Sequence, residues 1–310
     1  MALPSREAME AMMVSHRDAA LARGYNPPAR RHTYALPTYL ESWPSALQSL
    51  SIPQVDIPLT RDEAVALGSN NIGLGEAFAP EPLPMDSIRE KLVDAFKKLG
   101  DEPAFIRLGS RSPKDVFYWP KDTFQVDNAD EALQIMTAGS ERVMEDIRLS
   151  LHFDHLPHLF LRKWMDIPEW CEFRCFMKDR KLIGVSQYYG RKVFPELAEE
   201  RSSILWAIER FFLNRFRDLC HLDDVVFDIV VKHAEVSNTY NSALCGLPPW
   251  HNWQVKLLEI NPFWNLADPC LFDWPMLELL TEKGLREFRY YKTTLQMFDG
   301  TPAIIREEQI

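Results

Sequence analysis

The sequence predicts a mixed fold, α/β or α+β, arranged as one large domain or as two close lobes. Strand-like and helix-like segments alternate along the chain instead of forming separate blocks. A strong hairpin is expected at residues 172–187, where two apolar strands flank the polar turn Lys-Asp-Arg-Lys. A length of 310 residues with 46% hydrophobic side chains is enough to build more than one core.

The amino-terminal part is expected to be a helical arm followed by proline-punctuated chain. A helix is predicted over residues 5–23, ended by Gly24 and the pair Pro27–Pro28, so residues 1–34 form a mobile or docking arm. Residues 51–59 are expected to be extended, because proline fixes its own backbone angle and biases the residue before it. Helices are predicted at 60–68 and 86–99, with a loop at 69–84 between them.

The rest of the chain alternates strands with helices. Strands are predicted at 104–108, 159–164, 172–178, 181–187, 225–231 and 253–260, helices at 128–150 and 196–219, and a surface loop at 233–252. We expect a first lobe at 35–163, a second lobe at 164–285 that carries a metal site, and a carboxyl-terminal extension at 286–310, a division that the family resemblance described below implies.

Composition excludes several classes of protein. A formal net charge of −10 argues against a protein that coats nucleic acid, although it does not prevent local binding of an anion. No stretch approaches the roughly 20 apolar residues of a membrane span, so no membrane association is expected. Five cysteines without framework spacing fit reduced thiols and a cytoplasmic location.

An acidic group near the carboxyl-terminal strands predicts a metal site. Glu259 and Asn261 alternate with apolar residues, so both side chains point the same way at the end of a strand. Asp228 stands alone in an apolar strand and therefore needs a cation or hydrogen-bond donors. Carboxylate and amide oxygens are the ligands that Mg²⁺ prefers. The alternative is a structural ion network in which the two acids pair with arginine or lysine.

A basic turn after the strand at 104–108 is a candidate phosphate site. Arg107 is followed by Ser110, Arg111 and Lys114 in a turn of small residues. Such a turn can close over phosphates, because backbone amides and the guanidinium fork supply donors. The alternative is an ordinary solvated turn.

Two further basic positions lie in the central strands. The first is Arg162-Lys163-Trp164, and the second is the pair Glu172 and Arg174, which share one face of a strand. Arg174 could contact phosphate, while Glu172 could orient it or accept a hydrogen bond from a ribose. The alternative is a cross-strand ion pair worth about 0.2–1 kcal/mol.

These segments together resemble one family. The ordered set FIRLGSRSPKD (105–115), LFLRKW (159–164), EFRCFMKDRKLIGVSQ (172–187), VFDIVV (226–231) and LLEINPFWNLADPCLFDW (257–274) is similar to the cell division cycle protein 123 family. The stretch SWPSALQSLSIPQVDIPLTRDEAVAL (42–67) resembles the amino-terminal region of the same family, so the resemblance covers about residues 38–280.

The resemblance implies an ATP-grasp fold in which ATP and Mg²⁺ bind in a cleft between two α/β lobes. Adenine would lie near Arg162, Lys163 and Trp164, which link the lobes. The phosphates would be held by the family's lysine position, here Arg107, by the turn with Ser110, Arg111 and Lys114, and by the hairpin pair Glu172 and Arg174. The metal ligands would be Asp228, Glu259 and Asn261. Arg107 and Arg174 would hold a transferred phosphoryl group in line.

The chain departs from the family pattern at three places. Arginine replaces lysine at 107, which keeps the charge and changes the geometry. Glutamate replaces the usual aspartate at 259, and the resulting Glu-x-Asn is similar to the arrangement in ATP-grasp ligases. The polar stretch at 233–252 is longer than the usual connection. The chain is thus expected to be a divergent member.

Two functions follow from the resemblance. In the first, the protein is an ATP-dependent assembly factor or chaperone that binds the gamma subunit of translation initiation factor 2, or another protein. In the second, it is an ATP-dependent ligase that joins a carboxylate to an amine, or RNA ends. Both need ATP and Mg²⁺, so the sequence leaves open whether the protein is an enzyme.

Overall fold

The computed structural model describes residues 32–71, 83–116, 119–190, 192–233, 253–265, 267–291 and 304–309. The predicted helix at 5–23 lies outside these residues, as does most of the loop at 69–84. The predicted surface loop at 233–252 also lies outside them, except for His233, which belongs to the last described strand before it. The strands are β1 (Gln54–Pro58), β2 (Ala104–Leu108), β3 (His158–Lys163), β4 (Glu172–Lys178), β5 (Lys181–Gln187), β6 (Val225–His233), β7 (Trp253–Pro262), β8 (Arg286–Tyr291) and β9 (Ile304–Gln309).

The helices are distributed between the strands, so the predicted mixture of helix and strand is confirmed. They are η1 (Leu36–Thr38), η2 (Leu40–Ser42), α3 (Ser45–Gln48), α4 (Arg61–Ser69), α5 (Asp86–Leu99), α6 (Ala129–Met136), α7 (Glu141–His152), η3 (Glu169–Cys171), α8 (Pro195–Phe211), the π-helical turn η4 (Phe212–Phe216), α9 (Arg217–Leu219) and α10 (Trp274–Lys283). None of the described helices is both long enough and apolar enough to span a bilayer.

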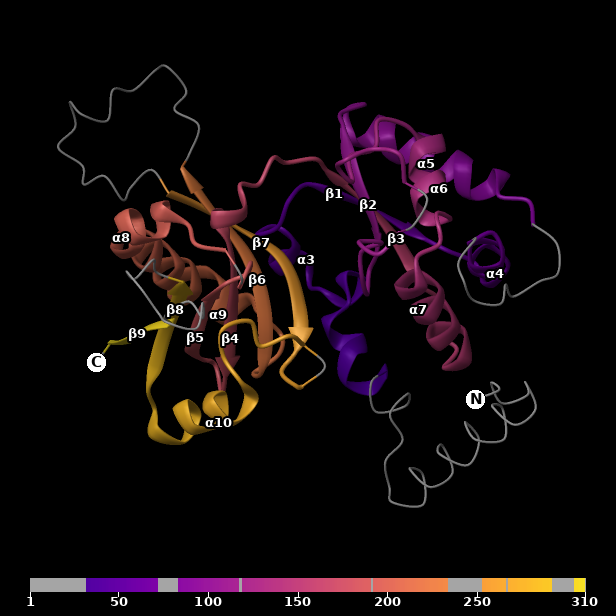
Figure 1. The fold of residues 1–310 in the computed structure, drawn as a ribbon. Coiled ribbons are helices and arrows are strands. Elements are labelled where there is room, and N and C mark those ends of the chain that lie inside the picture. Colours follow the sequence, from indigo (N-terminus) through magenta and orange to yellow (C-terminus); the bar gives the residue numbers. More distant parts are fainter. Residues whose placement is uncertain are drawn as a thin grey trace, which may run out of the picture.

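Two sheets lie side by side, each with its own helices (Figure 1). The smaller sheet has the order β1-β3-β2 and is antiparallel throughout. With α4 to α7 it forms what we call the small lobe. The larger sheet has the order β7-β6-β4-β5-β8-β9, in which only β5 and β8 run parallel. With α8 and α10 it forms the large lobe. The segment from η1 to α3 lies between the lobes (Figure 1).

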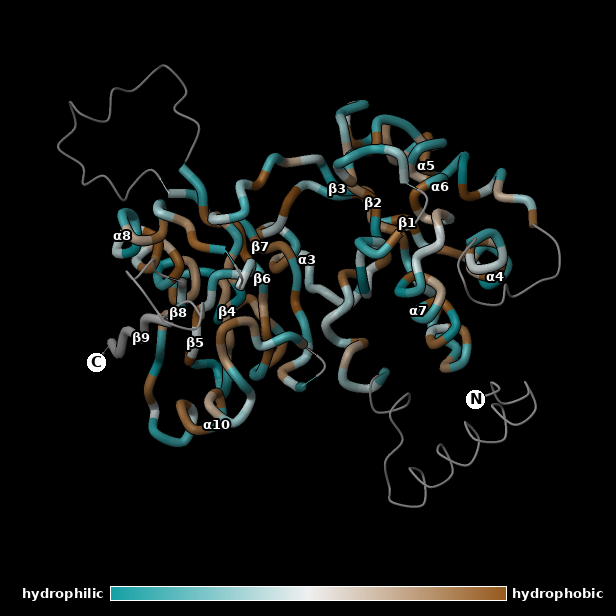
Figure 2. The backbone as a smooth tube through the Cα atoms, in the orientation of Figure 1, coloured by the Kyte–Doolittle hydropathy of each residue, from teal (hydrophilic) through white to brown (hydrophobic). Residues whose placement is uncertain are grey.

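The small lobe forms because its helices each present one apolar face. In α5, Ile88, Leu92 and Phe96 recur every four residues and are buried. The helix ends at Gly100, whose φ of 87° is the left-handed cap that glycine adopts most easily. A capping box between Thr60 and Glu63 starts α4. Hydrophobic residues concentrate in these interior positions, while turns are hydrophilic (Figure 2).

The prediction of one helix over 128–150 is wrong. The segment contains α6 and α7, separated at Gly139 and Ser140. The first helix ends at Met136, Gly139 then takes a φ of 85° in the connection, and the Ser140 hydroxyl accepts from the Val143 amide to cap the second helix. The break directs α7 along the small lobe toward the turn after β2.

The large sheet has a different cover on each face. On one face α8 packs over β4, β5, β6 and β7 through residues such as Ile208, Phe173 and Phe227. On the other face α10 covers part of the sheet around Phe176 and Phe272. The remainder of that second face carries polar side chains and looks toward the small lobe (Figure 1).

The carboxyl-terminal boundary differs from the predicted one. Residues 286–310 were expected as an extension, but β8 pairs directly with β5, and β9 pairs with β8. This part of the chain therefore completes the six-stranded sheet. The amino-terminal segment also reaches the large lobe, because Ser51 forms a parallel bridge with Leu257 of β7.

Candidate functional site

A polar row crosses the large sheet on the face that looks toward the small lobe. Strand register places Arg174 of β4 opposite Asp228 of β6, and Asp228 opposite Glu259 of β7. Arg174 donates two hydrogen bonds to Asp228, at 2.8 and 2.7 Å, and both side chains are almost completely buried. Although burial disfavours the guanidinium, the charge and hydrogen bonds of Asp228 raise the pKa of Arg174 well above its ordinary value.

Glu259 connects the row to the small lobe. Its carboxylate accepts from Nη2 of Arg107 at 2.7 Å, and Arg107 lies on β2 of the smaller sheet. Arg107 also donates to the carbonyl oxygens of Leu108 and Ser110, which fixes its direction. Burial alone would raise the pKa of Glu259, but the Arg107 guanidinium lowers it below the ordinary value. The ion pair therefore spans the two lobes with both charges present.

The turn after β2 carries two cations in different situations. Arg111 donates to Asp146 at 2.8 Å and to Glu145 at 2.7 Å, both on α7, so its charge is already balanced. Lys114 is exposed, and its ammonium group lies 5.4 Å from the centre of the Tyr188 ring. Among the described residues Lys114 makes no ion pair. It is therefore the cation of this turn that is available to a ligand.

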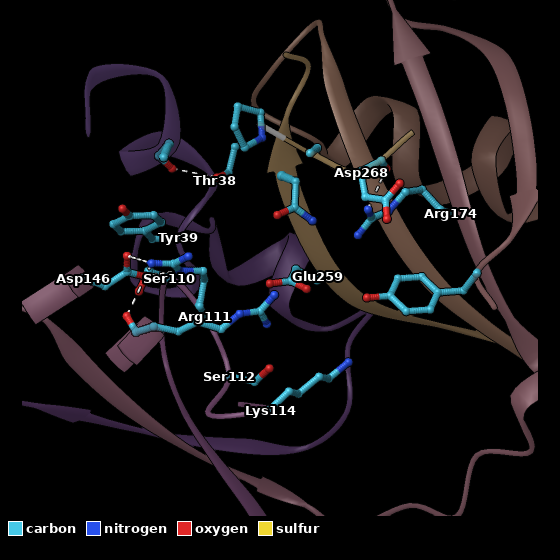
Figure 3. A pocket seen from close by; sticks show the side chains of 16 residues that line it. Thr38, Tyr39, Ser110, Arg111, Ser112, Lys114, Asp146, Arg174, Glu259 and Asp268 are labelled. Atoms are coloured by element: carbon cyan, nitrogen blue, oxygen red, sulfur yellow. Dashed lines mark hydrogen bonds and ion pairs between the residues drawn. The ribbon is translucent and has the colours of Figure 1, made fainter. Parts of the chain in front are cut away.

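These groups surround a hollow of about 380 Å³ between the two sheets (Figure 3). Its lining comes from the segment before β1, the turn after β2, helix α7, the β4–β5 hairpin and the end of β7. The lining residues are Ala35, Thr38, Tyr39, Ser110, Arg111, Ser112, Lys114, Arg142, Asp146, Arg174, Tyr188, Glu259, Asn261, Pro262, Ala267 and Asp268. The volume lies in the range of small-molecule sites.

The D123 family profile matches residues 76–303, which is most of the chain. The chain belongs to the D123 family. A translation initiation factor eIF2 assembly protein of Xenopus laevis is 26% identical over 238 residues, which are 74% of this chain and 64% of that protein. The cell division cycle protein 123 of Phaeosphaeria nodorum is 26% identical over 231 residues, 71% of this chain and 55% of that protein. The chain thus spans less than two thirds of these relatives.

A solved structure has the same fold as this D123 chain. Cdc123 from Schizosaccharomyces pombe superposes with a TM-score of 0.61 at 22% identity, covering 80% of this chain and 92% of that one. The predicted ATP-grasp fold and the predicted family are therefore confirmed. The likeness at this identity concerns the fold, so the roles of the site residues rest on the geometry of the D123 chain itself.

The hollow of the D123 chain brings six of the predicted site residues together. They are Ser110, Arg111, Lys114, Arg174, Glu259 and Asn261. Arg107 contacts the hollow through Glu259, and Asp228 lies behind Arg174 with 1% of its surface exposed. Asp228 is thus screened from the hollow by the arginine that it neutralises. Asp228 therefore matches the alternative prediction, in which this carboxylate pairs with an arginine in a structural ion network.

Arg162, Lys163 and Trp164 do not line this hollow. The Arg162 guanidinium is buried beside β7, where it donates to the Leu258 carbonyl at 2.9 Å and to the Ser51 hydroxyl at 2.7 Å. Burial, with a contribution from Arg107, lowers the pKa of Arg162 to about 9. Lys163 is paired with Glu102 at the surface, and the Trp164 indole donates to Asp166 at 2.9 Å. Any contact of these residues with adenine stays a prediction.

Tyr188, Asp146 and Asp268 are site residues that the sequence did not reveal. The Tyr188 ring lies between the Lys114 ammonium and the Arg174 guanidinium, whose carbon is 5.0 Å from the ring centre. The signal in the sequence for Tyr188 is its position directly after Gln187, the last residue of the hairpin strand β5. Asp268 follows β7 in a stretch without regular pattern, and its carbonyl accepts from Arg174 at 2.8 Å.

The oxygen atoms on the large-lobe side are of the chemical type that a divalent cation binds. Glu259 and Asn261 line the hollow together with Asp268, whose carboxylate is exposed. The Asn261 amide nitrogen is buried and has no hydrogen-bond partner among the described residues. The described residues contain no group of three or more His, Cys, Asp or Glu already gathered as ligands. A cation would therefore be held by Glu259 and the Asn261 oxygen after Glu259 leaves Arg107.

Glu172 of the D123 chain is buried next to this site and should make stability depend on pH. Burial raises the pKa of Glu172 from 4.5 to about 7, with Asp228 and Glu259 adding to the effect. Between these values the folded state keeps a proton that the unfolded state releases, so the free energy of unfolding falls as pH rises.

Glu172→Gln should remove that dependence and stabilise the protein by about 3 kcal/mol above pH 7, relative to the native chain. Urea unfolding across this pH range measures the difference. Glu90→Gln, on the exposed side of α5, is the control and should leave the profile unchanged. Parallel profiles for the native chain and Glu172→Gln would show that Glu172 is ionised in the folded protein.

Proposed function

We propose that this D123 protein binds Mg·ATP in the hollow between its lobes and acts in the assembly of translation initiation factor 2. The observation that carries the nucleotide site is the convergence of opposite charges from the two lobes. Lys114 and Arg107 come from the small lobe, while Glu259 and Asn261 come from the large lobe. A triphosphate with a bound cation needs both sets within one hollow.

Each part of the lining has a role in this proposal. The Lys114 ammonium and the guanidinium of Arg107 would hold phosphate oxygens, with Arg174 supporting the far end of the chain of phosphates. Ser110 and Ser112 add hydroxyl groups on the small-lobe side (Figure 3). The cation, held by Glu259 and Asn261, supplies charge neutralisation for the phosphates. Mg·ATP would therefore contact both lobes and favour one arrangement of them.

The partner is proposed from the relatives. Proteins of Xenopus laevis and Ajellomyces capsulatus that match this chain are named translation initiation factor eIF2 assembly proteins. We infer that this chain binds the gamma subunit of that factor, which would place its action in the cytoplasm. Because ATP fixes the relative position of the lobes in this proposal, we expect partner binding to be stronger when Mg·ATP is present.

Capture of purified gamma subunit by the immobilised chain tests this function. Mg·ATP should raise the melting temperature of the chain and strengthen capture about tenfold, which corresponds to a coupling of about 1.4 kcal/mol. GTP with Mg²⁺ is the control for the nucleotide. A melting temperature insensitive to Mg·ATP would refute the nucleotide site, and absence of capture by the ATP-bound chain would refute the partner.

The ligase alternative rests on one local feature, the Glu259-x-Asn261 pair at the end of β7. A ligase would release ADP or AMP when the right carboxylate, amine or RNA end is supplied. Product formation with an acceptor, without any effect of the gamma subunit, would favour the ligase. Tight ATP binding without turnover, together with capture of the gamma subunit, would favour the assembly factor.

A further inference from the structure

A second hollow, of about 530 Å³, lies on the face of the large sheet that α8 covers. The polar row with Arg174 and Glu259 lies on the opposite face. The second hollow runs between helix α8 with its continuation η4 and the first residues of β7. We call it the β7 groove. It is lined by Trp206, Ala207, Arg210, Phe211, Asn214, Arg215, Trp253, Gln254, Val255 and Lys256.

The groove follows the edge of the sheet. Four consecutive residues of β7, from Trp253 to Lys256, all line it. Side chains of consecutive strand residues point to opposite faces, so a hollow lined by all four residues reaches the edge of the strand. Strand order agrees, because β7 is the terminal strand of the sheet among the described strands and pairs with β6 along its other side.

Backbone groups of β7 point into this edge. The Leu257 amide donates outward to the Leu50 carbonyl at 2.9 Å, and the Leu257 carbonyl accepts from the Ser51 hydroxyl at 2.7 Å. In an antiparallel strand the amide and carbonyl of one residue point the same way, and every second residue repeats the direction. Val255 therefore presents both groups outward. Within the described chain no residue bonds them.

The groove is basic although the protein is acidic overall. Arg210, Arg215 and Lys256 line it, no acid does, and none of the three forms an ion pair with a described residue. The Arg210 guanidinium lies 4.8 Å from the centre of the Trp206 ring. Asn214 and Arg215 belong to the π-helical turn η4, a local geometry that is frequent at functional sites. Although the formal net charge is −10, three cations that make no ion pair with a described residue gather here, so the groove is suited to an acidic ligand.

We propose that the β7 groove binds an extended, acidic segment of a partner protein, which adds to β7 as a further strand. The segment's backbone would bond the outward amide and carbonyl of Val255. Its acidic side chains would pair with Arg210, Arg215 and Lys256, and an apolar side chain would pack between Trp206 and Trp253. Edge-strand addition uses backbone bonds for affinity and flanking side chains for selectivity. This site does not depend on the nucleotide hollow.

Single-stranded RNA also combines negative charge with groups that stack on aromatic rings. Two observations favour a peptide. The outward amide and carbonyl of Val255 match a peptide backbone, and only the edge geometry explains why residues of both faces of β7 line the groove. The experiment must therefore distinguish RNA binding from peptide binding.

Fluorescence anisotropy with a labelled short peptide of alternating glutamate and valine tests the proposal on the full chain. A lysine–valine peptide and labelled oligouridylate are the comparison probes. The glutamate peptide should bind, and added salt should weaken binding. Arg210→Glu with Arg215→Glu should lower the affinity at least tenfold, whereas Lys283→Glu at the exposed end of α10 should leave it unchanged.

Val255→Pro tests the backbone part of the proposal. Proline removes the outward amide without touching the ladder to β6, so the fold should persist while affinity falls about tenfold. Should that variant unfold, slower hydrogen exchange of the Val255 amide in the peptide-bound native chain supplies the same information. Failure of the native chain to bind the glutamate peptide, tighter binding of oligouridylate, or an unprotected Val255 amide in the complex would overturn the proposal.

Discussion

Asp228→Ala is expected to lower the free energy of unfolding by about 3–5 kcal/mol, because it leaves the Arg174 guanidinium buried without its counter-charge. Both members of the pair are nearly inaccessible, and two hydrogen bonds of 2.8 and 2.7 Å join them. Removing one partner of such a pair costs far more than the pair contributes. Chemical denaturation of the variant measures the loss.

The control for Asp228→Ala is the exposed pair of Asp94 and Lys97 on α5. Asp94→Ala should change stability by less than about 1 kcal/mol. The double variant Asp228→Leu with Arg174→Met should recover most of the loss, since no unpaired charge remains. A single Asp228→Ala variant as stable as the native chain would show that water or another group already compensates Arg174.

Lys114→Met is expected to weaken Mg·ATP binding about thirtyfold, equivalent to about 2 kcal/mol, while leaving the fold intact. Lys114 lines the hollow, is exposed, and makes no ion pair with a described residue, although its charge acts on Glu172 and Glu259 nearby. Its charge is therefore free to interact with phosphate, whereas the charge of Arg111 is balanced by Asp146 and Glu145. Isothermal titration with Mg·ATP measures the change in affinity.

Lys97→Met is the matched control for Lys114→Met, since it removes an exposed lysine on α5 outside the hollow. It should leave ATP affinity and stability unchanged. Equal affinities for the native chain and Lys114→Met would show that Lys114 does not contact the nucleotide. Arg142, which also lines the hollow, would then be the candidate phosphate ligand. Arg111→Met should instead reduce stability more than affinity, because it removes the guanidinium that pairs with the buried Asp146 carboxylate.

Local pattern predicts the strands of the large lobe well. Alternation in β4, with Phe173 and Cys175 inward, places Glu172 and Arg174 on the face that the structure shows. The same rule puts Glu259 and Asn261 together at the end of β7. A bulge between Asp228 and Ile229 then moves Leu258 from the main core into a separate cluster with Cys171 and Val230. A single extra residue in a ladder leaves no clear sign in composition.

Pairing between distant segments could not be predicted in the same way. Asp146 pairs with Arg111 from α7, which starts at Glu141 after a break, whereas the hydrophobic pattern predicts one continuous helix over 128–150. Likewise β8 joins β5 across about 100 residues of sequence, a distance over which hydrophobic pattern carries no pairing information. The sequence supplied the ionisable groups of the site, while tertiary contacts determined which charges remain available to a ligand.

In the proposed nucleotide site, the Arg107–Glu259 ion pair would make nucleotide binding an exchange of partners. Each of the two groups would contact the ligand, and each is already satisfied by the other at 2.7 Å. Mg·ATP would therefore displace this ion pair before it gained its own contacts, so its affinity would be the difference between two electrostatic energies. The same ion pair ties β2 to β7 and limits how far the lobes separate, so it holds the lobes close to the geometry proposed to receive the phosphates.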